Sequence, residues 1–178
     1  MTDLAHLEAE ILKEHSKRQA NKIALWVGSD KRKFRQLMEL FLRGEYRVTQ
    51  RSAWSITICS DRYPALITPR LSEMLKKVEE PGVHDAVKRN VFRILRTQEI
   101  PRSLLGKVAA LCFDNLEAID VPIAVRVHSM YVLANIAGKE PEIGRELQLI
   151  IEKMLPYSGA GIRACGRKAL KRLSKNQL

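Results

Sequence analysis

The stretch VHDAVKRNVFRILR, residues 83–96, alternates apolar and basic side chains at the spacing of an α-helix. Residues three and four apart share one face of a helix, so a wheel at that period separates the two kinds of side chain. Four apolar residues fall on one side: Val87, Val91, Ile94 and Leu95. Three arginines lie within about 60° of each other on the opposite side: Arg89, Arg93 and Arg96. The stretch therefore predicts an amphipathic helix with a core face and an outward basic face.

The same pattern recurs along the chain. Val87-Lys88 has counterparts in Val125-Arg126 and Ile162-Arg163, at offsets of 38 and 37 residues, and Thr49-Gln50 lies a further 38 residues back. Other positions keep this register: Ala53, Val91, Ser129 and Gly166 coincide, as do Ile56, Ile94, Val132 and Ala169. Another amphipathic helix is predicted before each aligned helix, over residues 30–43, 69–79, 102–116 and 141–155. A shared register over four copies indicates internal repeats.

Helix, turn and helix at a period of about 38 residues predict an all-α fold, a right-handed α-α superhelix or solenoid. One helix pair cannot bury its apolar stripe alone, so neighbouring pairs must stack. We expect a single domain over 1–178, with N-terminal capping helices in 1–28 that carry Leu4, Leu7, Ile11 and Leu12 on one face. The four repeats are predicted at residues 29–62, 63–100, 101–138 and 139–178.

Proline and glycine mark the predicted helix ends. Pro69, Pro101 and Pro141 suit a first helical turn, where a missing N–H has no partner to lose. Thr68 is a predicted N-cap and Gly44 a predicted C-cap. The segment WSITIC (54–59) comes closest to a strand pattern, but it continues a helical period that begins at Val48. The sequence therefore predicts no strand.

These features resemble HEAT repeats of the armadillo-type superfamily, over about residues 30–175. In that family an apolar-then-basic pair opens the second helix of each repeat, as in Val87-Lys88, Val125-Arg126 and Ile162-Arg163. The segments QRSAWSI, HDAVKRNVFRILR and PIAVRVHSMYVL also resemble a small bacterial family of HEAT-like proteins. The resemblance implies an α-solenoid that acts as an interaction module, with the second helices along its concave surface.

The composition is strongly basic, with a formal net charge of +11 and a pI near 9.8. Such a balance favours acidic partners, namely acidic protein surfaces, nucleic acid or anionic membranes. The isolated cysteines Cys59, Cys112 and Cys165 predict buried reduced thiols in a cytoplasmic protein. Neither a signal peptide nor a membrane span is expected, because no apolar run approaches about 18 residues.

The sequence offers little support for catalysis. It contains neither a Walker-type nor a dinucleotide-binding glycine motif, so no cofactor is predicted. The histidines His6, His15, His84 and His128 lack metal-ligand spacing, so no metal is predicted either. His84 precedes a predicted helix, which indicates a capping role. The sequence contains no motif that supports lyase chemistry. HEAT-like DNA glycosylases use aromatic and acidic residues on a basic face, but Trp26 and Trp54 both sit in strongly apolar contexts.

The outward face of the second helices supplies the candidate ligand-binding residues. Carrying the register of the opening helix to the other repeats selects a basic stripe with one tyrosine: Arg47, Arg51, Arg89, Arg93, Arg96, Tyr131, Lys168, Lys171 and Lys175. The stripe is interrupted in the third repeat, where Val127, Tyr131 and Ala134 take the place of the cations. Stacking is expected to turn the stripe into one discontinuous basic groove. An alternative interpretation is a solvated face that binds nothing.

Three functions remain open from the sequence. The first is a non-enzymatic interaction or scaffold module that binds an acidic protein or peptide. The second is nucleic-acid binding through phosphate contacts, in which Tyr131 could stack on a base. The third is an enzyme, either a DNA glycosylase or a HEAT-like lyase, for which no catalytic residue can be named. The sequence favours the first.

Overall fold

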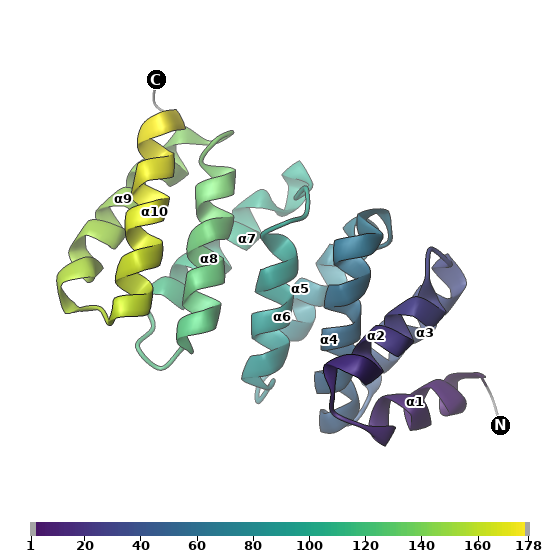
Figure 1. Cartoon of the computed structure of the whole chain (residues 1–178). Coiled ribbons are helices and arrows are strands. Elements are labelled where there is room, and N and C mark those ends of the chain that lie inside the picture. Colours follow the sequence, from purple (N-terminus) through teal and green to yellow (C-terminus); the bar gives the residue numbers. More distant parts are fainter. Residues whose placement is uncertain (1–2, 177–178) are drawn as a thin grey trace. The chain divides into compact units, whose positions relative to one another are not determined.

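The computed structural model describes residues 3–176, where ten α-helices and three short 3-10 helices follow one another without a strand (Figure 1). The first six α-helices are α1 (Asp3–Lys13), α2 (Lys17–Val27), α3 (Lys31–Arg43), α4 (Tyr46–Arg62), α5 (Leu71–Glu79) and α6 (Asp85–Leu95). The last four are α7 (Arg102–Glu117), α8 (Ile123–Ile136), α9 (Pro141–Met154) and α10 (Ala160–Asn176). The 3-10 helices are η1 (Pro64–Leu66), η2 (Thr68–Arg70) and η3 (Leu155–Tyr157). The prediction of an all-α chain is confirmed for these residues.

The helices group into two compact units, Met1–Glu99 and Ile100–Leu178. In the first unit α4 packs between α2 and α6 and also contacts α1 and α3. In the second unit α8 packs against α7, α9 and α10. The single domain over 1–178 remains a prediction, and its terminal residues 1–2 and 177–178 lie outside the described residues.

The repeat pattern is confirmed as consecutive helix pairs. The predicted first helices correspond to α3, α5, α7 and α9, and the aligned second helices to α4, α6, α8 and α10. Within the first unit α2, α4 and α6 lie side by side, and within the second unit α8 and α10 do so. The predicted N-terminal capping helices are α1 and α2, which form a further pair. Each second helix thus buries its apolar side against its own partner and its neighbours, as expected for a solenoid.

The core face of the opening stretch is buried as its periodicity predicts. The apolar residues of α6, namely Val87, Val91, Ile94 and Leu95, are each 1% exposed. Ala53, Ser129 and Gly166, which share the register of Val91, are buried as well. Small side chains at this position suit the close approach of neighbouring second helices.

Most helix ends follow the predicted signals, but Pro101 precedes α7 as its N-cap residue and does not lie in its first turn. Gly44 ends α3, and the imidazole of His84 accepts a hydrogen bond from the Ala86 N–H at the start of α6. The prediction that Thr68 is an N-cap is wrong. Thr68 begins the 3-10 turn η2, its side chain accepts no capping hydrogen bond, and α5 starts only at Leu71. Thr68 and Pro69 are therefore used in a tight turn that leads directly into the helix.

A buried lysine holds the turn after α3. Lys77 is 9% exposed, and its ammonium donates hydrogen bonds to the Leu42 carbonyl at 2.9 Å and to the Glu80 carboxylate at 2.6 Å. The last carbonyls of a helix have no partner within the helix, so a cation at this end satisfies one of them. Lys77 therefore connects α5 to the end of α3 and is a structural cation.

Candidate functional site

The nine residues of the predicted stripe divide between the two units. In the first unit, four lie on α4 and α6, and Arg96 directly follows α6; in the second unit, four lie on α8 and α10. The discontinuous basic groove that stacking is expected to build from these residues remains a prediction. The contacts of each residue decide whether its charge is available to a ligand.

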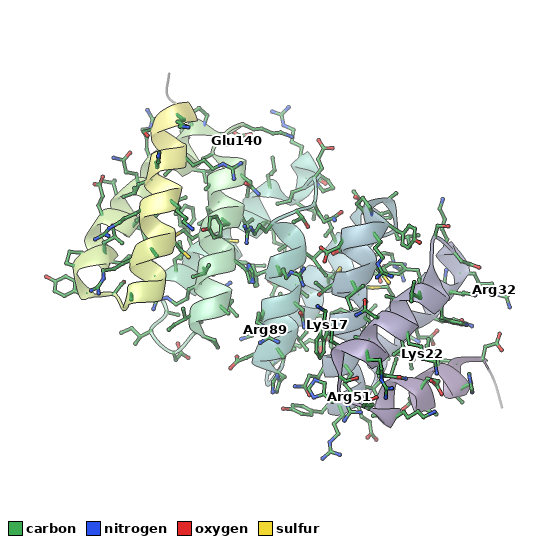
Figure 2. The ribbon with its side chains drawn as sticks, viewed as in Figure 1. Lys17, Lys22, Arg32, Arg51, Arg89 and Glu140 are labelled. Atoms are coloured by element: carbon green, nitrogen blue, oxygen red, sulfur yellow. The ribbon has the colours of Figure 1, made fainter. Side chains whose placement is uncertain are left out.

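Arg51 is a structural cation. Its guanidinium donates hydrogen bonds to the Leu12 carbonyl at 2.7 Å and to the Ile11 carbonyl at 3.4 Å, both at the end of α1 (Figure 2). The partial negative charge at a helix C-terminus favours such a contact. Arg51 therefore connects α4 to α1. Its contacts support this structural role and not the predicted binding of a ligand.

The arginines of α6 are partly compensated. Arg93 forms an ion pair with Asp61 of α4 at 2.7 Å, with both side chains a little over 40% exposed. Arg96 is exposed and also has an interaction partner. Arg89 of α6 and Arg47 of α4 are exposed, and neither forms an ion pair with another described residue. The basic face of the first unit therefore offers fewer free charges than the sequence predicts.

Replacing Arg51 by methionine should lower the stability of the first unit by about 1 kcal/mol, because the Leu12 carbonyl loses its charged partner. Urea denaturation followed by tryptophan fluorescence measures this loss. Arg47→Met is a matched control, one turn earlier on the same helix and exposed. It should leave the midpoint unchanged. Equal midpoints for the two variants would contradict a structural role for Arg51.

The third repeat contributes little to an outward face. Tyr131 is half-buried in α8 and has an interaction partner, and Val127 is half-buried. Ala134, which the register places on the outward stripe, is 0% exposed, so this placement is wrong. The physical reason is that α8 is covered by α7, α9 and α10, and its sequence is apolar on nearly all sides. A helix that is apolar all round is buried all round.

The cations of α10 form the most complete basic surface of the second unit. The predicted residues Lys168, Lys171 and Lys175 are all exposed. Three further exposed cations lie on the same helix and were not among the predicted site residues: Arg163, Arg167 and Arg172. Together the six cover about half of the helical wheel. Among the described residues none of them is paired with a carboxylate, and α10 itself contains no Asp or Glu.

The other half of α10 anchors the helix. Ile162, Gly166, Ala169 and Leu173 are buried against α8 and α9. The six cations are therefore presented by a helix whose position is set by its packing. A helical wheel drawn over residues 160–175 separates the two halves, so the sequence contains the signal that would have found the three missing arginines.

A groove lies where α10 begins. It has a volume of about 620 Å³ and is lined by Leu155, Pro156, Ala160, Arg163, Ala164 and Arg167. Four of these residues are apolar, and the other two belong to the cationic side of α10. The cationic surface is therefore next to a concave feature of the same unit that is lined by both apolar and basic side chains.

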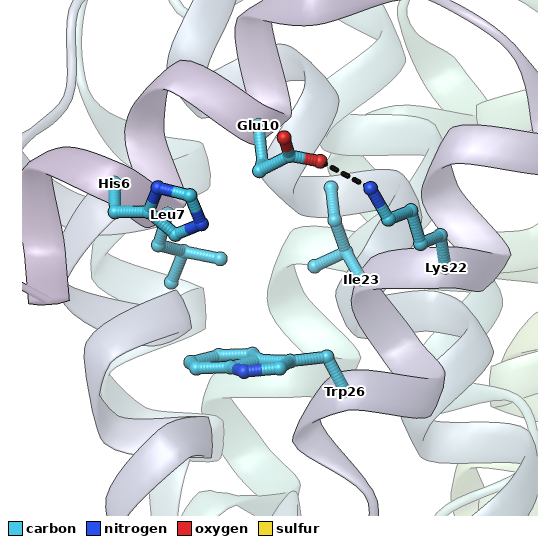
Figure 3. A pocket seen from close by; sticks show the side chains of 6 residues that line it. All are labelled: His6, Leu7, Glu10, Lys22, Ile23 and Trp26. Atoms are coloured by element: carbon cyan, nitrogen blue, oxygen red, sulfur yellow. Dashed lines mark hydrogen bonds and ion pairs between the residues drawn. The ribbon is translucent and has the colours of Figure 1, made fainter.

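A smaller pocket of about 140 Å³ lies between α1 and α2, and Figure 3 shows the side chains that line it. The Glu10 carboxylate accepts a hydrogen bond from Lys22 at 2.6 Å and another from Gln19. These two bonds, the one from Lys22 first, lower the pKa of Glu10 to about 2. The charged groups at this pocket compensate each other, so the pocket offers no free charge to select a ligand.

Trp26 at the edge of this pocket is 40% exposed, although its sequence context is apolar. The Lys33 ammonium lies 5.0 Å from the centre of the indole ring and donates a hydrogen bond to the Trp26 carbonyl. Trp54 is half-buried and meets His15 edge to face. Both tryptophans thus have partners within the first unit.

The cysteines differ in accessibility. Burial raises the pKa of the Cys59 and Cys112 thiols to about 12, whereas Cys165 is half-buried. A thiol must ionise to react, so the native protein should react rapidly with Ellman's reagent at one thiol near about pH 8. The other two should react only after unfolding in guanidinium. Cys165→Ser should remove the rapid reaction, and two rapid equivalents in the unaltered protein would contradict the burial of Cys59 and Cys112.

Within residues 3–176, no group of three or more His, Cys, Asp or Glu side chains is arranged to hold a metal ion. The same residues contain no helix with the length and apolar character that a membrane crossing requires.

Consecutive helix pairs in a shared register define the class of helical repeat proteins. Within that class the chain belongs to the HEAT repeat domain family, whose model matches residues 7–173. Members of this family generally act as scaffolds in protein interactions. No curated protein and no solved structure shows significant similarity to the chain.

Proposed function

We propose that this HEAT-repeat protein is a non-enzymatic interaction module that binds an acidic protein surface or peptide through the cationic side of α10. The single observation that supports the proposal most is the set of six exposed, unpaired cations on an anchored helix without acidic residues. An isolated surface cation is usually solvated, but six on one face produce a field that attracts an extended anion.

The contrast with the first unit supports this choice of surface. There Arg51 donates a hydrogen bond to the Leu12 carbonyl at the end of α1, and Arg93 forms an ion pair with Asp61. On α10 no such internal partner competes with a ligand in the described part of the chain. The scaffold role of the family favours a protein or peptide as the partner.

Nucleic acid is the second candidate, because α10 presents its cations from Arg163 to Lys175, a length of about 18 Å along the helix axis. Phosphates on a duplex could follow such a row. Binding through phosphates releases condensed counterions, so it weakens steeply between about 50 and 200 mM salt.

Fluorescence anisotropy with two labelled probes, an oligo-glutamate peptide and a DNA duplex of random sequence, tests the proposal. We expect saturable binding of the peptide at about 50 mM salt and weaker binding of the duplex under the same conditions. Tighter binding of the duplex with a steep salt dependence would favour the second candidate. Binding of neither probe would contradict both candidates and leave α10 as a solvated face.

A further inference from the structure

The groove at the start of α10 is built by small residues. Leu155 of η3 packs against Gly166 so closely that a Cβ atom at position 166 would lie 2.9 Å from the Leu155 Cδ2 atom. Gly166 thereby allows α10 to approach η3. Ala160 and Ala164 are exposed and lie one turn apart on α10, so they leave open space beside η3 that longer side chains would fill.

Two arginines flank this space. Arg163 and Arg167 are also one turn apart, both are exposed, and neither guanidinium has a partner among the described residues. A guanidinium can bind a carboxylate through two parallel hydrogen bonds. The groove therefore combines a few exposed apolar side chains with two free carboxylate-binding groups.

We propose that this groove receives one apolar anchor side chain of the acidic partner segment, while carboxylates on either side of the anchor bind Arg163 and Arg167. This inference rests on the proposed function and specifies the partner as an acidic peptide with a central aliphatic or aromatic residue. Buried apolar anchors in pockets dominate the affinity of protein interfaces, and surrounding charges orient the partner.

The shape of the surface favours a peptide over the other anions. A nucleic-acid backbone has no aliphatic side chain to contact the apolar residues of this groove. A membrane surface is broad and presents no single side chain that would enter the space between Ala164 and Pro156. Only a protein segment combines a single protruding apolar group with carboxylates at the spacing of neighbouring residues.

Two labelled peptides test the anchor: one with a leucine between runs of glutamate, and one with serine in place of that leucine. The protein should bind the leucine peptide about tenfold tighter, because burial of a leucine side chain is worth about that factor. Ala164→Phe fills the groove with a side chain at an exposed position. This variant should bind both peptides equally, with the affinity that the unaltered protein has for the serine peptide.

Ala110→Phe is the matched control, since Ala110 is an exposed alanine of α7 outside the groove. It should keep the tenfold difference. Ala160→Phe provides a second groove-filling variant, and circular dichroism checks that each variant is folded. Agreement between the two groove variants excludes a local misfolding effect at one position.

The outcomes separate the two proposals. Binding of neither peptide to the unaltered protein contradicts the proposed function itself. Equal binding of both peptides leaves the proposed function intact and overturns the anchor. A tenfold difference that persists in Ala164→Phe and Ala160→Phe also overturns it. Tighter binding to phosphatidylserine-containing vesicles than to either peptide would also overturn the anchor, if the binding to vesicles is unchanged in Ala164→Phe.

Discussion

Replacement of Lys168, Lys171 and Lys175 by glutamate should weaken binding of the oligo-glutamate peptide by about 100-fold at low salt. Each change removes one attraction and adds one repulsion. An exposed pair contributes about 0.5 kcal/mol in either direction, so three reversals amount to about 3 kcal/mol. The three side chains are exposed and unpaired among the described residues, so the helix should remain folded.

A control with the same change in net charge separates a local site from overall attraction. Lys31, Arg32 and Arg35 are exposed cations of α3 in the first unit, and their replacement by glutamate alters the charge equally. The formal charge falls from +11 to +5 in both triple variants, since each reversal removes two units. We expect the α3 variant to bind the peptide within about threefold of the unaltered protein at about 200 mM salt, where long-range attraction is screened. Equal loss in both variants would mean that α10 is not a distinct site.

Gly44→Ala should destabilise the first unit by about 3 kcal/mol, the upper range for overpacking a well-packed position. A Cβ atom at this position would lie 2.4 Å from the Leu40 carbonyl oxygen and 2.6 Å from the Val48 Cγ1 atom. The carbonyl belongs to the backbone at the end of α3, so it cannot move aside as the tip of a side chain could. The whole turn between α3 and α4 must open to accept the methyl group.

Tryptophan fluorescence during urea denaturation measures this effect in the first unit. The sequence has two tryptophans, Trp26 and Trp54, and both lie there. Gly106→Ala is the matched control, because Gly106 lies within α7 and nothing comes within 4 Å of a Cβ atom built on it. Circular dichroism should show that this variant is unchanged or more stable by up to about 1 kcal/mol, since alanine favours helix. An unchanged fluorescence midpoint for Gly44→Ala would mean that the turn is looser than its contacts indicate.

The helices were predictable because their signals are local. Residues three and four positions apart share one side of a helix, so the periodicity of the sequence predicts that Val87 and Val91 of α6 are buried. The repeat register extended that inference to α8 and α10. The missed cap at Thr68 shows the limit of local signals, because the same residues favour both a helix start and a 3-10 turn.

The candidate site was only partly predictable. The register selected three lysines on α10: Lys168, Lys171 and Lys175. It also selected Arg51 and Arg93, whose guanidinium groups are bound by other groups of the first unit. The three arginines of α10 were missed because the register of one helix was carried over to another. The cationic half of α10 is wider than the stripe on α6.

The sequence by itself determined the repeat: a period near 38 residues, the buried sides of α6 and α10, and the excess of cations on α10. Only the tertiary structure decided which cations are free. Arg51 reaches a carbonyl 39 positions away, and Arg93 reaches a carboxylate 32 positions away. The groove beside α10 likewise depends on packing, because residues of η3 and of α10 line it together. Periodicity reports which side of a helix faces the core, but the availability of a charge depends on partners that packing brings together from distant parts of the chain.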